Sequence, residues 1–294
     1  MKLFNLKYVF FSLIAGLAFH ASIQAQVGIG TVEPEGILDV ESSTQGIVFP
    51  RVVLTSTVVE APVVNPNGVS LVAGTTVYNT TASNNGSNDV YPGIYSWNGS
   101  RWTPQFILEE YEKFEQTGGC MRTTVRESYS NPNPLDDDNI PGLTAQVFTP
   151  TYTGTYRIEV KVNFASGAID DFTSQDLISL ATMEGAFFFK LQGTGVDINP
   201  DPVLYDYSEG WLYCHSYGTH NSVESPALED NRVPHFASLV FYEDLAAGDN
   251  YTFTLSNCIN TGDAYFVNNG DSGTGQGYIG CDIPCTVEFT FLKE

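Results

Sequence analysis

Apolar and polar residues alternate over residues 156–164. The apolar positions are Tyr156, Ile158, Val160, Val162 and Phe164, and the polar positions between them are Arg157, Glu159, Lys161 and Asn163. A period of two predicts a β-strand with one buried face. The same alternation recurs at 251–255 and 287–291, and nowhere does a long apolar period of 3.6 residues appear. The pattern therefore predicts an all-β protein.

The density of apolar residues divides the chain into modules. Residues 26–105 have few apolar residues per strand and many turn residues. We expect this smaller, extended β-rich module to bury too little surface alone and to need several copies wound together, with an independent small β-domain as the alternative. Residues 120–294 contain a longer run of short strands. Residues 106–119 form a neck or linker, whose apolar residues fit either a short helix or the first strand of the second module.

Two segments of the second module resemble a known family. The first is Thr149-Pro-Thr-Tyr-Thr-Gly-Thr-Tyr156, which leads into the alternating strand. The second is 235–255, where the pair Gly248-Asp249 predicts the tight turn of a hairpin. Both resemble the globular heads of complement subcomponent one-q and of the tumour necrosis factor superfamily. The resemblance implies a C-terminal antiparallel jelly-roll sandwich over 120–294 that forms trimers, binds other molecules and catalyses nothing.

The first module resembles a different group of proteins. Its motifs are Val27-Gly-Ile-Gly-Thr31, Leu38-Asp-Val40, Pro50-Arg51 and Tyr95-Ser-Trp97-Asn-Gly-Ser-Arg-Trp102. They resemble N-terminal segments of secreted proteins from Bacteroidetes-type bacteria and shaft segments of bacteriophage tail fibres. The resemblance implies a stalk and trimerisation module, and it says little about chemistry.

Residues 1–25 have the features of a secretory signal peptide. Lys2 and Lys7 give a positive start, residues 8–19 are apolar, and a stretch of small and polar residues ends at Ala25. The apolar run is too short for a spanning helix, which takes about 20 apolar residues. We expect cleavage after Ala25, export to the medium or the cell surface of a bacterium, and no transmembrane segment in the mature chain. A retained N-terminal anchor is the alternative.

The charge of the chain excludes two classes of partner. The formal net charge is −22 at pH 7, and loss of Lys2 and Lys7 with the signal makes it more negative. Such a surface repels nucleic acid and anionic membranes. It suits an extracellular protein, including one that binds divalent cations.

Five cysteines lie in the second module and predict disulfides in an exported protein. They are Cys120, Cys214, Cys258, Cys281 and Cys285. We expect at least four to be oxidised, with a pairing that the sequence does not give. Zinc is the alternative, with His215 beside Cys214, although two-residue cysteine spacings and paired histidines are missing.

A cluster of acidic residues predicts a candidate calcium site. Asp136, Asp137 and Asp138 stand in one loop, and calcium takes oxygen ligands from such loops. A solvated acidic loop is the alternative. The series Asp197-x-Asn199-x-Asp201 has the first spacing of an EF-hand but lacks the glycine and glutamate required further on, so we exclude an EF-hand.

Trp211, Tyr213 and Tyr217 are candidate ligand-binding residues. Exposed aromatic rings stack on sugars and form hot spots in protein interfaces. Because Trp211 and Tyr213 also fit a period of two, packing in the core or between subunits is the alternative.

The chain lacks the sequence motifs of two common hydrolase sites. It has neither a Gly-x-Ser-x-Gly elbow nor a His-Glu-x-x-His motif, and 34 acidic residues make chance pairs of carboxylates common. We therefore expect a non-enzymatic, homotrimeric recognition or adhesion protein that binds a glycan or a protein through its head. A lectin-like carbohydrate-binding module of a polysaccharide-degrading system is the alternative, and a secreted hydrolase comes next.

Overall fold

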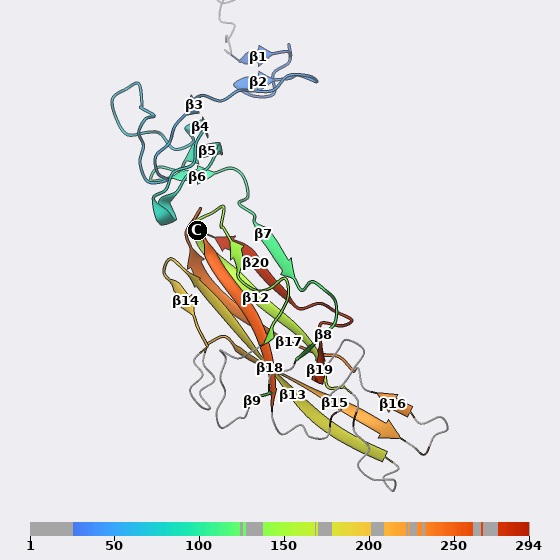
Figure 1. Cartoon of the computed structure of the whole chain (residues 1–294). Coiled ribbons are helices and arrows are strands. Elements are labelled where there is room, and N and C mark those ends of the chain that lie inside the picture. Colours follow the sequence, from blue (N-terminus) through green and yellow to red (C-terminus); the bar gives the residue numbers. More distant parts are fainter. Residues whose placement is uncertain are drawn as a thin grey trace, which may run out of the picture. The chain divides into compact units, whose positions relative to one another are not determined.

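The computed structural model of the chain is shown in Figure 1. It describes residues 26–123, 126–127, 138–167, 169, 178–200, 209–221, 223, 228–230, 233–260, 266 and 276–293. The predicted signal peptide lies outside these residues. The chain divides into two compact units, Met1–Phe49 and Pro50–Glu294, and the division falls within the module predicted for 26–105. Over the described residues, no helix is long and apolar enough to cross a membrane.

Two short parallel strands form the described part of the first unit. β1 (Val27–Ile29) pairs with β2 (Leu38–Val40). Gly30 follows β1 with a φ of +84°, and a Cβ at this position would lie 2.0 Å from the carbonyl oxygen of Glu41, so only glycine fits. None of the residues 26–49 is buried. The strand pair therefore has no core of its own.

Residues 51–104 form a four-stranded sheet with a small core. The strand order is β3 (Arg51–Val52), β4 (Thr76–Asn79), β5 (Gly93–Trp97) and β6 (Trp102–Pro104), and the 3-10 helix η1 (Gly86–Asn88) stands in the β4–β5 connection. The buried core residues are Leu54, Leu71, Val77, Val90, Tyr95, Trp97 and Trp102. Large aromatic rings contribute much of this core. Residues 51–104 belong to the same compact unit as the head, so the expectation that the first module buries too little surface alone stays a prediction.

The tryptophan motif of the first module is a hairpin turn. The Asn98 side chain accepts hydrogen bonds from the N–H groups of Ser100 and Arg101, each at 2.9 Å. This turn brings the rings of Trp97 and Trp102 to 5.4 Å between centroids. The Asn-Gly-x-x spacing therefore places two core tryptophans against each other.

The head consists of two sheets. In the first sheet, β12 (Gly154–Ala165) pairs along one edge with β17 (His235–Leu245) and along the other with β20 (Thr286–Lys293). β7 (Tyr111–Glu115) pairs with β20, and the short strands β8 (Met121–Thr123) and β19 (Gln276–Ile279) extend the sheet.

The second sheet is built around β13. β13 (Ile178–Gly193) lies between β18 (Tyr251–Asn260) and β15 (Trp211–Asn221). The flanking strands are β9 (Arg126–Glu127), β10 (Asp138–Asn139), β11 (Gln146–Phe148), β14 (Val196–Ile198) and β16 (Leu228–Asp230). Figure 1 shows the long strands of both sheets as the long arrows in the lower half of the picture.

The chain crosses repeatedly between the two sheets. β11 and β13 belong to the second sheet while β12 belongs to the first, and β17, β18 and β19 alternate in the same way. This antiparallel two-sheet weave is a jelly-roll sandwich, as predicted. The predicted hairpin at 235–255 is wrong: the turn exists, with Asp249 N–H bonded to the Ala246 carbonyl at 3.2 Å, but β17 and β18 enter different sheets.

The core of the head lies between the sheets and is rich in phenylalanine. The alternation over 156–164 is confirmed, because the five apolar side chains are at most 1 % exposed. The alternations at 251–255 and 287–291 also point into this core. Phe148 of β11 stacks on Phe289 of β20 at 4.1 Å. Because β12, β18 and β20 all direct apolar side chains into this core, a slip of any of them by one residue would turn those side chains outward.

The predicted neck contributes a strand to the head. Tyr111–Glu115 forms β7, and the ring of Phe114 meets those of Phe253 and Phe289 at 4.9 and 6.0 Å. Of the two interpretations of this segment, the strand is therefore the one the structure contains. The helix does not form, because pairing with β20 satisfies the backbone and buries Phe114 at the same time.

Candidate assembly and recognition surfaces

The four-stranded module meets the head at the Thr-rich turn before β12. The N–H of Thr153 donates to Tyr91 Oη at 2.8 Å, and the Thr153 hydroxyl donates to Asp89 Oδ2 at 3.0 Å. The ring of Tyr91 contacts that of Tyr152 edge-on at 4.8 Å. Asp89 is only 1 % exposed and also accepts from the Ser83 hydroxyl at 3.1 Å. A buried, hydrogen-bonded carboxylate thus joins the module to the head.

The same turn is anchored from the other side by Glu110. Its carboxylate accepts hydrogen bonds from the N–H of Thr151 at 3.0 Å and from the Thr151 hydroxyl at 2.8 Å. The Tyr156 hydroxyl also donates to Glu110. Burial, together with this hydrogen bond, raises the pKa of Tyr156 above its ordinary value, so the phenol stays protonated and remains a donor. The turn before β12 therefore bonds both to the four-stranded module and to Glu110.

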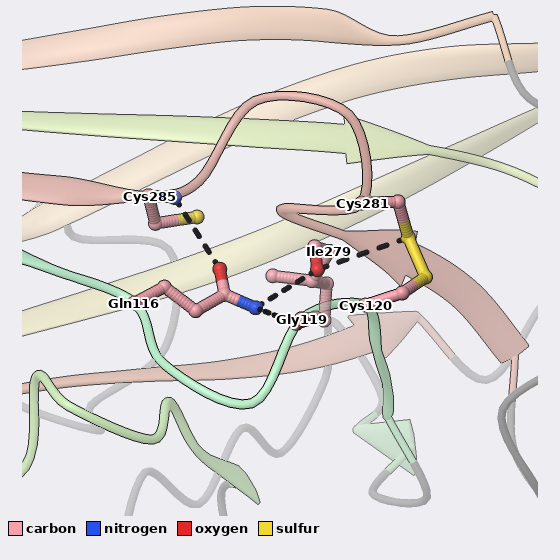
Figure 2. Close-up of a disulfide and its surroundings, with 6 residues drawn as sticks. All are labelled: Gln116, Gly119, Cys120, Ile279, Cys281 and Cys285. Atoms are coloured by element: carbon pink, nitrogen blue, oxygen red, sulfur yellow. Dashed lines mark hydrogen bonds between the residues drawn. A yellow bond between two sulfur atoms is a disulfide. The ribbon is translucent and has the colours of Figure 1, made fainter.

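One disulfide connects the two ends of the head. Cys120 follows β7 and Cys281 precedes β20, and the bond closes a separation of 161 residues (Figure 2). By the loss of chain entropy in the unfolded state, a loop of this size stabilises the fold by up to about 5 kcal/mol.

Gln116 holds the two loops that carry this disulfide. Its Nε2 donates to the carbonyl oxygens of Gly119 at 2.9 Å and Ile279 at 3.1 Å, and its Oε1 accepts from the N–H of Cys285 at 3.3 Å (Figure 2). The side chain is 6 % exposed. A Cβ at residue 280 would stand 1.9 Å from Oε1, which requires Gly280. The loops are therefore joined by both a covalent and a polar contact.

The remaining cysteines do not form the second bridge that the sequence predicts. Cys214 and Cys285 are buried free thiols in the core between the sheets, and Cys258 packs with Ala186 and Phe188 on the opposite side of the second sheet. Burial raises the pKa of Cys214 to about 11 and that of Cys285 to about 12. The expectation of at least four oxidised cysteines is wrong for this structure, because these side chains serve as small core residues.

The three candidate ligand-binding aromatics share one face of β15. Trp211 contacts Phe188 edge-on at 4.8 Å and Tyr213 at 5.9 Å, and Phe188 is 1 % exposed. Trp211 and Tyr213 therefore cover an apolar cluster on the outer side of the second sheet. Tyr217 is 36 % exposed, with its ring 5.3 Å from that of His235. Of the three residues, Tyr217 is the most exposed to solvent.

The predicted calcium site lies only partly within the described residues. Asp136 and Asp137 lie outside the described residues. Asp138 opens β10 and accepts a hydrogen bond from the Thr123 hydroxyl at 2.9 Å. Within the described part of the chain, no group of three His, Cys, Asp or Glu residues could hold a metal ion. Calcium binding by this loop therefore stays a prediction.

The outer face of β12, predicted as a polar face, carries a chain of ion pairs. Glu159 bonds to Arg157 at 2.9 Å and to Lys161 at 3.2 Å, and Lys161 reaches Glu288 of β20 at 2.9 Å. Burial raises the pKa of Glu159, but the hydrogen bonds from Arg157 and Lys161 outweigh it and leave the pKa lowered. The alternation of charge along 157–161 was the available signal.

Exposed apolar side chains surround these ion pairs. They are Tyr111, Phe236, Tyr242, Ile283 and Leu292, of which Phe236 is 84 % exposed and Tyr242 62 %. A hollow of about 400 Å³ lies beside the ion pairs, and Phe236, Ile283, Lys113 and Lys161 are part of its lining. This face is a second candidate recognition surface, separate from the aromatics of β15.

The N-terminal strand pair also exposes apolar side chains. Val27, Ile29, Leu38 and Val40 are 52, 56, 62 and 40 % exposed. Full burial of such side chains stabilises by about 1.5–3 kcal/mol each. The first unit would therefore be stabilised by contact with another apolar surface.

Comparison with known proteins gives a family match for the N-terminal part of the chain. Residues 28–115 match the family described as phage tail like trimerisation region. Among solved structures, the globular domain of a zebrafish complement 1qA protein matches 63 % of this chain and 100 % of its own at 13 % identity, with a TM-score of 0.22.

A second solved structure gives a weaker likeness. The VP2 subviral particle of infectious bursal disease virus matches 66 % of this chain and 44 % of its own at 10 % identity, with a TM-score of 0.16. Comparison with curated protein sequences gives no match. With structural scores this low, the fold assignment rests on the sheet topology.

The cysteine arrangement predicts a specific labelling pattern. Alkylation of the unfolded, unreduced chain should label Cys214 and Cys285, and Cys120 and Cys281 should become labelled only after reduction. In the folded chain at pH 8, Cys214 and Cys285 should react slowly, because the thiolate is the reactive form and burial raises their pKa. Peptide mass spectrometry measures each site. Labelling of Cys120 without reduction would contradict the assignment.

The joint between module and head predicts the effect of Thr153→Val. The change keeps the shape of the side chain but removes a donor to the buried Asp89 and an acceptor for the Ala247 N–H. We expect the free energy of unfolding to fall by about 1.5–3 kcal/mol, measured by denaturant titration. Thr149→Val removes an exposed hydroxyl bonded to Asn250 and should cost less than about 0.5 kcal/mol. Equal effects of the two changes would show that the joint is not special.

Proposed function

We propose that this chain is an exported trimeric recognition protein, in which three copies are joined through residues 28–115 and the jelly-roll heads bind a glycan or a protein. The proposal rests on two observations that concern the same residues of the N-terminal part. The region that matches a trimerisation family is also where apolar side chains stand exposed in the single chain. Exposed apolar surface of this extent calls for a partner.

Three features support export. Residues 1–25 have the pattern of a signal peptide. The head contains a disulfide that joins distant segments, a bond typical of oxidising compartments. The strongly negative net charge keeps a protein soluble and repels nucleic acid.

Binding, rather than catalysis, is the role we assign to the head. Strongly shifted pKa values often mark catalytic groups. Among the described residues, the largest shifts belong to Tyr156, Cys214 and Cys285, which are buried parts of the core between the sheets. Rigid sheets with exposed aromatic side chains suit recognition instead.

A lectin-like carbohydrate-binding module is the second candidate. The observation that favours it is the common face of Trp211, Tyr213 and Tyr217 on β15, because aromatic rings in a row can stack on successive sugars. Under this alternative, binding to polysaccharide depends on the β15 face and contributes to the action of a separate enzyme.

Oligomeric mass is the first test of the proposed function. The chain from Gln26 onward should have about three times its monomer mass in multi-angle light scattering, because association buries apolar surface that the single chain leaves in water. The mass should persist on dilution through the micromolar range. A monomer at all concentrations would contradict the proposal.

Binding is the second test, and two exposed tyrosines separate the candidate surfaces. A glycan array and a panel of secreted proteins are screened with the unmodified chain. Tyr217→Ala should then weaken binding to the best hit at least about tenfold if the β15 face is used, whereas Tyr242→Ala should do so if the face of β12 is used.

Tyr78→Ala provides the matched control for both variants. Tyr78 is 38 % exposed and lies on β4, outside the head. Because Tyr78 lies within the region proposed to join the copies, the mass of this variant is first checked by light scattering, and at an unchanged mass its binding should also be unchanged. A hit whose affinity falls only in the Tyr78 variant would place recognition outside the head.

A further inference from the structure

The strand pair β1–β2 has one apolar and one polar face. Its parallel register sets Val27 beside Leu38 and Ile29 beside Val40, and alternate residues of a strand point to the same side. These four side chains form an apolar strip. The opposite face carries Gly28 and Asp39, and Asp39 accepts a hydrogen bond from the Glu35 N–H at 2.9 Å.

The strip has no cover within its own unit. None of the residues 26–49 is buried, and each side chain of the strip is 40–62 % exposed. A two-stranded sheet of three residue pairs is at best marginally stable in water. The regular pairing of β1 with β2 therefore requires apolar contact from outside this unit.

The rest of the matched region does not have this requirement. Residues 51–104 enclose their own core around Trp97 and Trp102. Exposed valines occur there too, at 58, 64, 69 and 72, but these residues stand outside the strands of the module. Single exposed valines in connecting segments are ordinary on a protein surface. Within the region matched by the trimerisation family, the strand pair β1–β2 thus leaves its apolar side chains uncovered, whereas residues 51–104 bury a core.

We propose that the apolar strip of Val27, Ile29, Leu38 and Val40 is the main contact between copies of the chain, and that the four-stranded module is not. The partner is a second and a third copy, because identical chains around a threefold axis present the same strip to one another and close the assembly. The inference rests on the proposed trimer and assigns it to a place. The family match starts at residue 28, within β1, and so includes three of the four strip residues, Ile29, Leu38 and Val40.

The test replaces the strip in the full exported chain. The variant Val27→Thr/Ile29→Thr/Leu38→Thr/Val40→Thr keeps strand propensity and removes apolar surface. Sedimentation velocity over a concentration series should show a trimer for the unmodified chain. For the strip variant, the concentration at half-dissociation should rise at least about 100-fold. An unchanged melting temperature of the head confirms that the variant is folded.

A matched variant of the second part is the control. Val58→Thr/Val64→Thr/Val69→Thr/Val72→Thr changes four exposed valines of the same region and should remain trimeric. A strip variant that stays trimeric, or a control variant that dissociates in its place, overturns the inference and leaves the proposed trimer standing. A monomeric unmodified chain is a distinct result, since it overturns the proposed function and the inference with it.

Discussion

The head depends on the double pairing of β12, which shares eleven residue pairs with β17 and seven with β20. Since side chains alternate across a strand, this register decides at once which residues enter the core and which form the outer face. Tyr156, Ile158 and Val160 go inward, and Arg157, Glu159 and Lys161 go outward. A slip by one residue would exchange the two sets, bury three charges and expose an apolar row. The ion pairs and the phenylalanine core are therefore two consequences of one alignment.

The sequence predicts those features that repeat locally. The alternation along β12, β18 and β20 is visible without a structure because it has a period of two, and with it come the all-β class and the inward side chains. The joint at Thr153 is different: its partners Asp89 and Tyr91 are 64 and 62 positions away, and no local pattern connects them. The same reason hides the Cys120–Cys281 pairing. The hairpin predicted at Gly248 is wrong for a related reason. The turn is set by neighbouring residues, but the sheet that each strand joins is set by strands far away in the sequence.

Two strategies for burying apolar surface follow one another along the N-terminal part. Residues 51–104 fold around a few large rings, so a short chain encloses a core of its own. Residues 26–49 have only aliphatic side chains on brief strands and leave them in water. In the proposed trimer, the two segments would therefore differ in how their order depends on protein concentration: the core of residues 51–104 forms within one chain, and the strand pair would gain stability by mass action.

The disulfide sets how far the head can be stretched. A pull on the chain before residue 110 would first break the contacts of Thr153 with Asp89 and Tyr91 and then load β7, which five residue pairs connect to β20. Strand separation under such a load would proceed only as far as Cys120, because the covalent bond to Cys281 then takes the tension. Ten residues fully extended add at most about 35 Å. The strand pairing of the sandwich behind the bond, including β12 and β15, would therefore be kept while the segment before Cys120 extends by a bounded length.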